Sequence, residues 1–325
     1  MVRELTITAG EEESGLTVRE ILKSRFGLVD HDISRAKYRR DGICVNGQRT
    51  YVTTVLQSGD VLRVRIEDEP LRDVAVSDEP LDILYEDDDL LAVNKPAGVV
   101  VHPSHGHFAD SLGNAVAGHY LRNGEAHDIR TIGRLDKDTS GVMLYGKTRS
   151  AVYLLTKQHE AGLFRKTYLA LIWGRPDETG GTFDGPIGRV PGMKLKRKVR
   201  PDGDAAVTHY EVIGSFEAAG DPDGGVKPVS LVRVWLETGR THQIRVHFST
   251  AGYPLVGDEL YGGKPGFPAD CGGGGEGDGG VCRAALHCWK VTCRKPFSDE
   301  DVALTAPLPD DMAALIPADI MSRLT

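Results

Sequence analysis

Short apolar segments that alternate with turn-forming residues fill most of this 325-residue chain, and this pattern constrains its fold more than any other feature. Val207–Phe216 and Ser230–Leu236 alternate apolar and polar residues, which predicts strands of a half-exposed sheet. Helices are predicted over Leu112–Leu121, Ser150–Glu160 and Thr241–Thr250. Because predicted strands outnumber predicted helices from residue 81 onwards, we expect an α+β fold with a mixed, mainly antiparallel central sheet flanked by helices and loops.

Residues 1–68 have the pattern of a small separate module. A helix is predicted over Leu16–Phe26, a basic helix over Ile33–Arg40, a hairpin turn at Asn46-Gly47 and a strand over Val61–Ile66. This order resembles the S4 RNA-binding domain, although the opening Arg-Leu-Asp pattern of that family is absent. Residues 69–80 are acidic and poor in apolar side chains, as in a linker. We therefore expect an S4-like module (1–68), an acidic linker (69–80) and a larger domain (81–325).

Charge is distributed unevenly along the chain, whose net charge is −8. Eleven acidic residues and one basic residue lie between Glu67 and Asp89, so the rest of the chain carries about +2 by subtraction from −8. A basic segment contains Arg189, Lys194, Lys196, Arg197, Lys198 and Arg200, and a second cluster contains Arg35, Lys37, Arg39 and Arg40. Such local patches can bind a polyanion despite a negative total, or can simply be solvated surface.

The turn Arg134–Gly141 (RLDKDTSG) precedes an apolar run that reads as a buried strand. Asp136 and Asp138 could bind Mg²⁺ together with substrate phosphates, or could belong to an ordinary polar turn. The metal alternative predicts a phosphoryl-transfer enzyme that a chelator inhibits. His102, His105 and His107 offer a second metal alternative, although no other pair of ligands has matching spacing.

Two further segments carry side chains that could take part in catalysis or binding. Thr241, His242, Arg245 and Ser249 fall on one helical face, which is usually exposed; a buried Arg245 would require a carboxylate partner. Tyr168 lies in a predicted strand, where tyrosines are commonly core residues.

Seven segments between Leu81 and Pro309, in this order, resemble the RluA-type pseudouridine synthases, and in particular the RluC/RluD-like enzymes of the large ribosomal subunit. They are LYEDDDLLAVNKPAGVVVHPS, GRLDKDTSGVMLYGKT, RKTYLALIWG, GPIGR, AVTHYEV, LETGRTHQIRVHFSTAGYPLVGDELYGG and RAALH.

The resemblance implies a role for each matching position. Asp136 matches the essential aspartate, Arg134 the arginine that helps to extrude the target base, and Tyr168 the tyrosine that lies against that base. Arg245 matches the basic residue that pairs with the aspartate. We assign the basic segment 189–200 to contacts with RNA phosphates. No redox change occurs when uridine becomes pseudouridine, so neither a cofactor nor a metal is implied.

The expected partner is RNA, most simply 23S-type ribosomal RNA, with a transfer-RNA-directed synthase or an inactive ribosome-assembly factor as alternatives. The absence of an eighteen-residue apolar run and of a leader-like start predicts no membrane association and a cytoplasmic protein. We also expect a monomer. Two features depart from the family pattern: Gly133 replaces its usual His, and a glycine-rich insertion covers 272–280.

Overall fold

The computed structural model describes residues 2–67, 74–104, 106–125, 127–219, 226–262 and 281–324. The glycine-rich insertion, residue 68 at the end of the predicted module and residues 69–73 of the predicted linker therefore lie outside the described residues. The helices are α1 (Val18–Ser24), α2 (Asp30–Lys37), α3 (Leu112–Arg122), α4 (Arg149–Glu160), α5 (Gln243–Thr250), α6 (Asp310–Ala313) and α7 (Ala318–Met321), with short 3-10 turns η1 (Glu259–Tyr261) and η2 (Ser322–Leu324).

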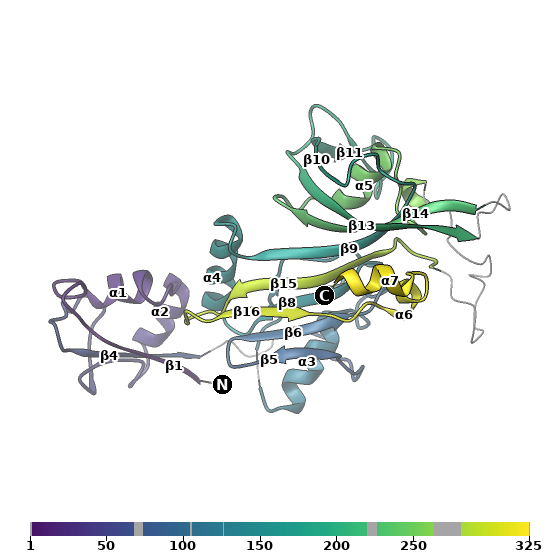
Figure 1. Cartoon of the computed structure of the whole chain (residues 1–325). Coiled ribbons are helices and arrows are strands. Elements are labelled where there is room, and N and C mark those ends of the chain that lie inside the picture. The colour runs from purple at the N-terminus through teal and green to yellow at the C-terminus, as the bar shows by residue number, and fades with distance from the viewer. Residues whose placement is uncertain are drawn as a thin grey trace.

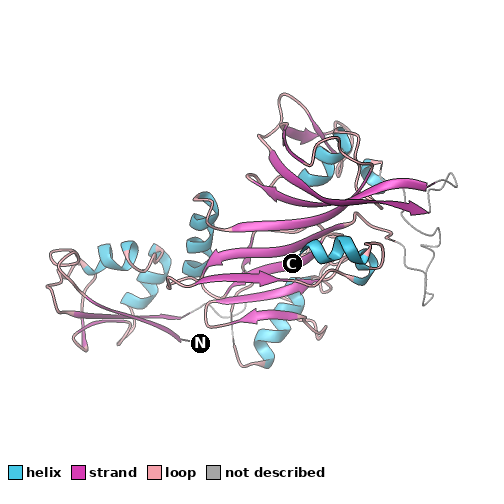
Figure 2. Ribbon diagram, viewed as in Figure 1, coloured by secondary structure: helices cyan, strands magenta, loops and turns pink. Residues whose placement is uncertain are grey.

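Strands dominate the described residues, as the sequence predicts (Figure 2). They are β1 (Val2–Thr8), β2 (Ile43–Val45), β3 (Gln48–Arg49), β4 (Val61–Glu67), β5 (Ile83–Glu86), β6 (Leu90–Lys95), β7 (Thr131–Ile132), β8 (Ser140–Gly146), β9 (Arg165–Trp173), β10 (Gly180–Asp184), β11 (Ile187–Arg189), β12 (Arg197–Val199), β13 (Val207–Ala219), β14 (Val226–Leu236), β15 (Leu286–Arg294) and β16 (Asp301–Thr305).

The N-terminal residues fold into a unit with its own core (Figure 1). Its four strands pair in the order β1-β4-β2-β3, and α1 and α2 pack on them. Helix α1 begins at a capping box, in which Thr17 and Glu20 each satisfy a backbone N–H of the other. The two predicted helices of this unit are therefore present.

A ten-stranded sheet forms the centre of the molecule, with the strand order β10-β13-β14-β9-β15-β8-β6-β5. Strand β16 adds to β15 and β7 adds to β8. All of these neighbours run antiparallel except β15 and β8, which are parallel. The predicted α+β class, with a mixed and mainly antiparallel sheet, is thus confirmed.

Strand β9 separates two cores because successive side chains point to opposite faces of a sheet. Tyr168, Ala170 and Ile172 belong to one cluster, whereas Leu169 and Leu171 belong to the other. The second cluster is covered by α6, α7 and the segment between them, which contribute Met312, Ile320 and Ile316 respectively. The uncovered part of the Tyr168 face is where the candidate site lies.

Two contacts attach flanking segments to the sheet domain. The buried carboxylate of Asp32 in α2 accepts hydrogen bonds from the backbone N–H and hydroxyl of Ser150, at the start of α4. A carboxylate there also complements the helix dipole. Ala75 and Ser77, in the predicted linker, both hydrogen-bond Asn114 of α3, so this part of the segment is docked on the domain.

Within the ranges described, none of the helices has the length and apolar character needed to span a membrane.

Candidate active site

The turn that carries Asp136 is held from behind by a buried lysine. Lys95 has no exposed surface, and its ammonium donates hydrogen bonds to the carbonyls of Pro96, Val99 and Lys137 at 2.7, 2.7 and 2.8 Å. Burial lowers the pKa of Lys95 to about 7, against the opposing charge of Asp138. Lys95 thereby fixes the backbone one residue after Asp136.

Arg283, which lies 145 residues further along the chain than Asp138, also holds this turn. Its Nη1 donates to the carbonyl of Asp138 at 3.1 Å, while Nε and Nη2 bind Asp311 at 2.7 and 3.0 Å. The turn then enters β8 through Gly141, whose φ is +109°. A Cβ there would lie 2.2 Å from the carbonyl oxygen of Cys288, so only glycine allows β8 to approach β15 this closely.

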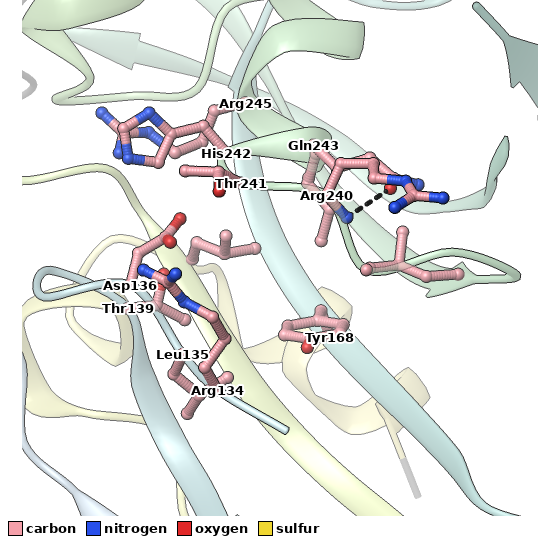
Figure 3. A pocket seen from close by; sticks show the side chains of 14 residues that line it. Arg134, Leu135, Asp136, Thr139, Tyr168, Arg240, Thr241, His242, Gln243 and Arg245 are labelled. Carbon is pink, nitrogen blue, oxygen red and sulfur yellow. Dashed lines mark hydrogen bonds between the residues drawn. The ribbon is translucent and has the colours of Figure 1, made fainter. Parts of the chain in front are cut away.

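Asp136 faces a pocket of about 70 Å³ whose walls come from four separate parts of the chain. Figure 3 shows its carboxylate pointing toward the side on which Thr241, His242 and Arg245 lie. The lining residues with polar side chains include Arg134, Asp136, Tyr168, Arg240, His242 and Arg245. All four residues that the resemblance singles out therefore share one pocket, whereas Asp138 is not part of its wall.

Arg245 is bound to Asp258 rather than to Asp136. Its Nε and Nη2 each donate to one carboxylate oxygen of Asp258 at 2.7 Å, and both side chains are buried. Burial lowers the pKa of the Arg245 guanidinium, but the hydrogen bonds and charge of Asp258 outweigh this and raise it. The negative charge of Asp136 raises the pKa further. The sequence requires a carboxylate partner for a buried Arg245, and the structure provides it thirteen residues further along the chain.

Helix α5 begins two residues later than predicted because His242 adopts a left-handed conformation, with φ +59°. Its predicted polar face is not exposed, since Arg245 is buried and Thr241, His242 and Ser249 are half-buried. Gln243 holds the preceding loop by accepting hydrogen bonds from the Arg240 backbone N–H, at 3.0 Å (Figure 3), and from the Thr238 hydroxyl. A non-glycine residue at positive φ is a local strain that such packing must sustain.

Tyr168 projects from β9 into the pocket with only 6% of its surface exposed. Desolvation, together with the nearby Cys288 and Asp136, raises its pKa well above 10, so its hydroxyl stays protonated. The ring is therefore a neutral aromatic surface beside Asp136.

Arg134 is exposed and forms no hydrogen bond or ion pair within the described part of the chain. Its charge, together with burial, lowers the pKa of His102. A free guanidinium at the rim of a pocket is available to a ligand.

The basic segment folds as the hairpin β11–β12, and its cations differ in what they contact. Arg197 donates to the carbonyls of Lys194, Leu195 and Lys196, and Arg200 binds Asp202 and the carbonyl of Arg189. These two arginines hold the hairpin together. The cations without ion pairs among the described residues are Arg189, Lys194, Lys196 and Lys198.

Tyr261 joins this hairpin to the pocket. Its hydroxyl accepts the backbone N–H of Arg197 at 3.0 Å and lies 2.9 Å from His242 Nδ1. The guanidinium of Arg245 lies 5.1 Å from the centre of its ring. Burial is the main reason that the pKa of Tyr261 is raised and that of His242 lowered.

Two of the histidines proposed as alternative metal ligands contact other side chains instead. His102 Nε2 lies 2.9 Å from the Thr131 hydroxyl, and His107 Nδ1 lies 2.7 Å from Asp110. His105 is outside the described residues. In the ranges that are described, no group of three or more His, Cys, Asp or Glu side chains could hold a metal ion.

Sequence reasoning missed Lys95, Asp258, Tyr261 and Arg283 as components of the site. Each lies in one of the seven quoted segments, but its partner is remote: 42 residues separate Lys95 from Lys137, and 145 separate Arg283 from Asp138.

Comparison with known proteins gives one consistent answer. Residues 89–250 match the family model described as "RNA pseudouridylate synthase". The "Uncharacterized RNA pseudouridine synthase YjbO" of Bacillus subtilis is 37% identical over 302 residues, which cover 93% of this chain and 98% of that protein. The "Ribosomal large subunit pseudouridine synthase D" of Vibrio parahaemolyticus is 35% identical over 326 residues, covering 98% and 96%.

Among solved structures, the "Human RNA Pseudouridylate Synthase Domain Containing 1" superposes with a TM-score of 0.55 at 25% identity. The match covers 76% of this chain and 95% of that one.

Proposed function

This chain belongs to the RluA-type RNA pseudouridine synthases, and we propose that it isomerises specific uridines of large-subunit ribosomal RNA with Asp136 as its essential carboxylate. The observation that carries the assignment is the convergence of Asp136, Tyr168 and Arg245 on one pocket from three separate segments. The ribosomal substrate is supported by the printed name of the Vibrio parahaemolyticus relative, which matches almost the whole chain.

The reaction requires a carboxylate in its ionised form. The N-glycosidic bond of uridine breaks, the base rotates, and a bond forms to its carbon; the carboxylate either attacks covalently or abstracts a proton from the sugar. The fixed positive charge of Arg245 lies near Asp136 and interacts with it across the pocket. Asp258 accepts hydrogen bonds only from Nε and Nη2 of Arg245. The other N–H donors of the guanidinium therefore remain for the substrate.

Tyr168 and Arg134 act on the base. A uridine stacked in RNA must leave its stack before its glycosidic bond can be reached, and an aromatic surface then holds it. Tyr168 supplies that surface inside the pocket, and the unpaired Arg134 at the rim stabilises the RNA from which the base has left.

The hairpin β11–β12 binds the RNA backbone. A hollow of about 270 Å³ between this hairpin and the loop before α5 is lined by Arg189, Arg197 and Arg240, and it adjoins the Asp136 pocket through Gly239, Arg240 and Thr241. Cations of this kind contact phosphates and set the register of the RNA without reading its sequence. Arg189, Lys194, Lys196 and Lys198 make these contacts, whereas Arg197 and Arg200 shape the hairpin.

The N-terminal unit is an S4-like RNA-binding module that selects the substrate. Its exposed side chains include Lys37, Tyr38, Arg40 and Tyr51, a combination of cations and aromatic rings suited to RNA. A module that recognises a folded RNA favours ribosomal RNA over short transfer-RNA loops. The protein then acts as a monomer in the cytoplasm.

The experiment is to map pseudouridine in total RNA from cells with and without this protein. At least one uridine of large-subunit ribosomal RNA should lose its modification in the deletion strain and regain it with the native gene but not with Asp136→Asn. A change confined to transfer RNA would identify the alternative substrate. If no position changes, the protein is the inactive assembly factor. Turnover should persist in EDTA, which a metal-dependent transferase would not tolerate.

A further inference from the structure

A second pocket, of about 350 Å³, opens directly beside the Asp136 pocket. The two share Arg134, Tyr168, Leu236 and Gly239 as common wall. The volume is within the range of sites that hold a nucleotide-sized ligand and is several times that of the first pocket. The proposed chemistry at Asp136 leaves this space without a role.

Lys166 places a positive charge in the wall of the second pocket. It precedes Tyr168 by two positions in β9, so both side chains lie on the same face of the sheet. Lys166 is half-buried, and it forms no hydrogen bond or ion pair with any residue that the structure describes. Desolvation lowers its pKa. A cation that is partly removed from water without a partner costs stability, so its presence there requires an explanation.

Gly133 makes room for this cation. Its φ is +72°, and a Cβ at this position would lie 3.2 Å from Lys166 Nζ. The side chain that the family usually carries here, a histidine, would begin at the space next to the ammonium. A side chain at position 133 would therefore crowd the Lys166 ammonium, and the glycine leaves that space open.

Arg134 is a second cation on the same pocket that has no partner among the described residues. The remaining wall includes the apolar Phe164, with the His159 ring 5.9 Å from it. Two unneutralised positive charges over an apolar wall match a ligand with an anionic linkage and an organic body. A small inorganic anion would fill only a fraction of 350 Å³.

We propose that this pocket binds the nucleotide next to the target uridine, with its phosphodiester on Lys166. The inference rests on the proposed function. Two adjoining pockets that share the Tyr168 wall are what two successive nucleotides require once the target base has rotated out of its stack. Lys166 then contributes to binding, and Arg134 lies between the two nucleotides.

The test compares Lys166→Met with Lys157→Met, a matched control in which an exposed lysine paired with Glu160 is removed from the neighbouring helix α4. The probe is an RNA segment that contains the mapped uridine, made in three forms: with natural phosphates, and with one uncharged methylphosphonate immediately 5′ or 3′ of that uridine. Equilibrium binding is measured by fluorescence anisotropy, and turnover is measured on the same natural RNA.

Lys166→Met should weaken binding of the natural RNA by about tenfold, because a charge-assisted contact is lost. One methylphosphonate should weaken the native protein similarly but leave Lys166→Met unaffected, since the two changes remove the same contact. Lys166→Arg should recover most of the affinity, and Lys157→Met should bind like the native protein.

The inference would be overturned if Lys166→Met left RNA affinity unchanged. It would also be overturned if each methylphosphonate weakened the affinity of Lys166→Met as much as that of the native protein. Thermal unfolding separates a structural role: removal of an unpaired desolvated cation should leave the melting temperature unchanged or raise it, and a clear decrease would count against the proposal. If the native protein forms no pseudouridine, the proposed function is refuted and this inference, which rests on it, falls with it; where native turnover is present, failure of the binding comparison overturns the inference alone.

Discussion

The Tyr261 hydroxyl lies 2.9 Å from His242 Nδ1, and the same oxygen accepts the backbone N–H of Arg197. The relationship connects the β11–β12 hairpin with a strained residue at the wall of the Asp136 pocket. Tyr261 is thus a positioning residue, which acts through His242 and through its ring beneath Arg245.

Tyr261→Phe keeps the ring but removes both hydroxyl contacts. We expect kcat to fall about fivefold to tenfold with little change in KM, because one or two hydrogen bonds that orient His242 and the hairpin are lost. Single-turnover kinetics on the mapped RNA segment check this. Tyr153→Phe, at an exposed position of α4, is the control. A rise in KM without a change in kcat would place Tyr261 in RNA docking.

Asp258→Ala leaves the Arg245 guanidinium buried without its partner. The free energy of unfolding should fall by about 3–5 kcal/mol, and turnover should disappear. The double variant Arg245→Met/Asp258→Leu replaces the pair by apolar side chains, and it should recover most of the stability but none of the turnover. Denaturant unfolding and turnover, measured side by side, check both outcomes. Recovery of turnover in the double variant would contradict the proposed role of Arg245.

Arg245→Ala tests whether Arg245 contributes to turnover or to RNA binding. Turnover should be lost while RNA affinity changes less than twofold, because Arg245 acts at the reacting uridine and not on the backbone. Anisotropy binding with Lys157→Met as reference measures this. Equal losses of binding and turnover would assign Arg245 to docking.

His287 should make stability depend on pH. It is fully buried, with Nδ1 2.9 Å from the Ser140 hydroxyl, and burial lowers its pKa to about 4. In the unfolded chain it takes up a proton near pH 6.5, whereas the folded protein resists this down to about pH 4. Its contribution is therefore complete above pH 6.5 and lost as the pH falls to 4, by about 3 kcal/mol.

Urea unfolding between pH 7 and pH 4 measures that slope. His287→Phe, which cannot titrate, should flatten it whatever its own stability at pH 7. An unchanged slope would show that other groups cause the acid sensitivity.

The exposed face of the N-terminal unit should determine affinity and leave catalysis intact. Tyr38→Ala/Arg40→Ala removes an aromatic ring that is 78% exposed and a neighbouring cation. We expect the Kd for ribosomal RNA to rise about tenfold or more, with kcat at saturating RNA unchanged. Tyr153→Ala removes another exposed tyrosine and serves as control. Unchanged affinity of the double variant would contradict an RNA-binding role for this face.

The sequence predicts elements well where their signal is local. Tyr168 is predicted to lie in a strand and does lie in β9 (Arg165–Trp173), since the run of β-forming apolar residues around it is nearly unbroken. Helix α5 shows the limit. Its polar face predicts exposure, yet Arg245 is buried, because a bidentate partner thirteen residues away compensates the charge.

The supports of the site are less predictable than its central residues. Asp136 is found from a contiguous motif, but the lysine that holds its turn contacts carbonyl oxygens, and any residue supplies these. Position 133 illustrates the same problem. The sequence identifies Gly133 as a departure, and only the structure shows that Lys166 occupies the neighbouring space.

The parallel pairing of β8 with β15 has a consequence for the order of events during synthesis. Ser140 pairs with His287, and the turn before β8 is held by Arg283, so the Asp136 turn can be completed only after residues near 290 have left the ribosome. The N-terminal unit, whose core is made by residues 5–66 with only Phe297 added at its edge, can fold much earlier. The N-terminal unit of a nascent chain would thus be folded before the Asp136 turn is complete.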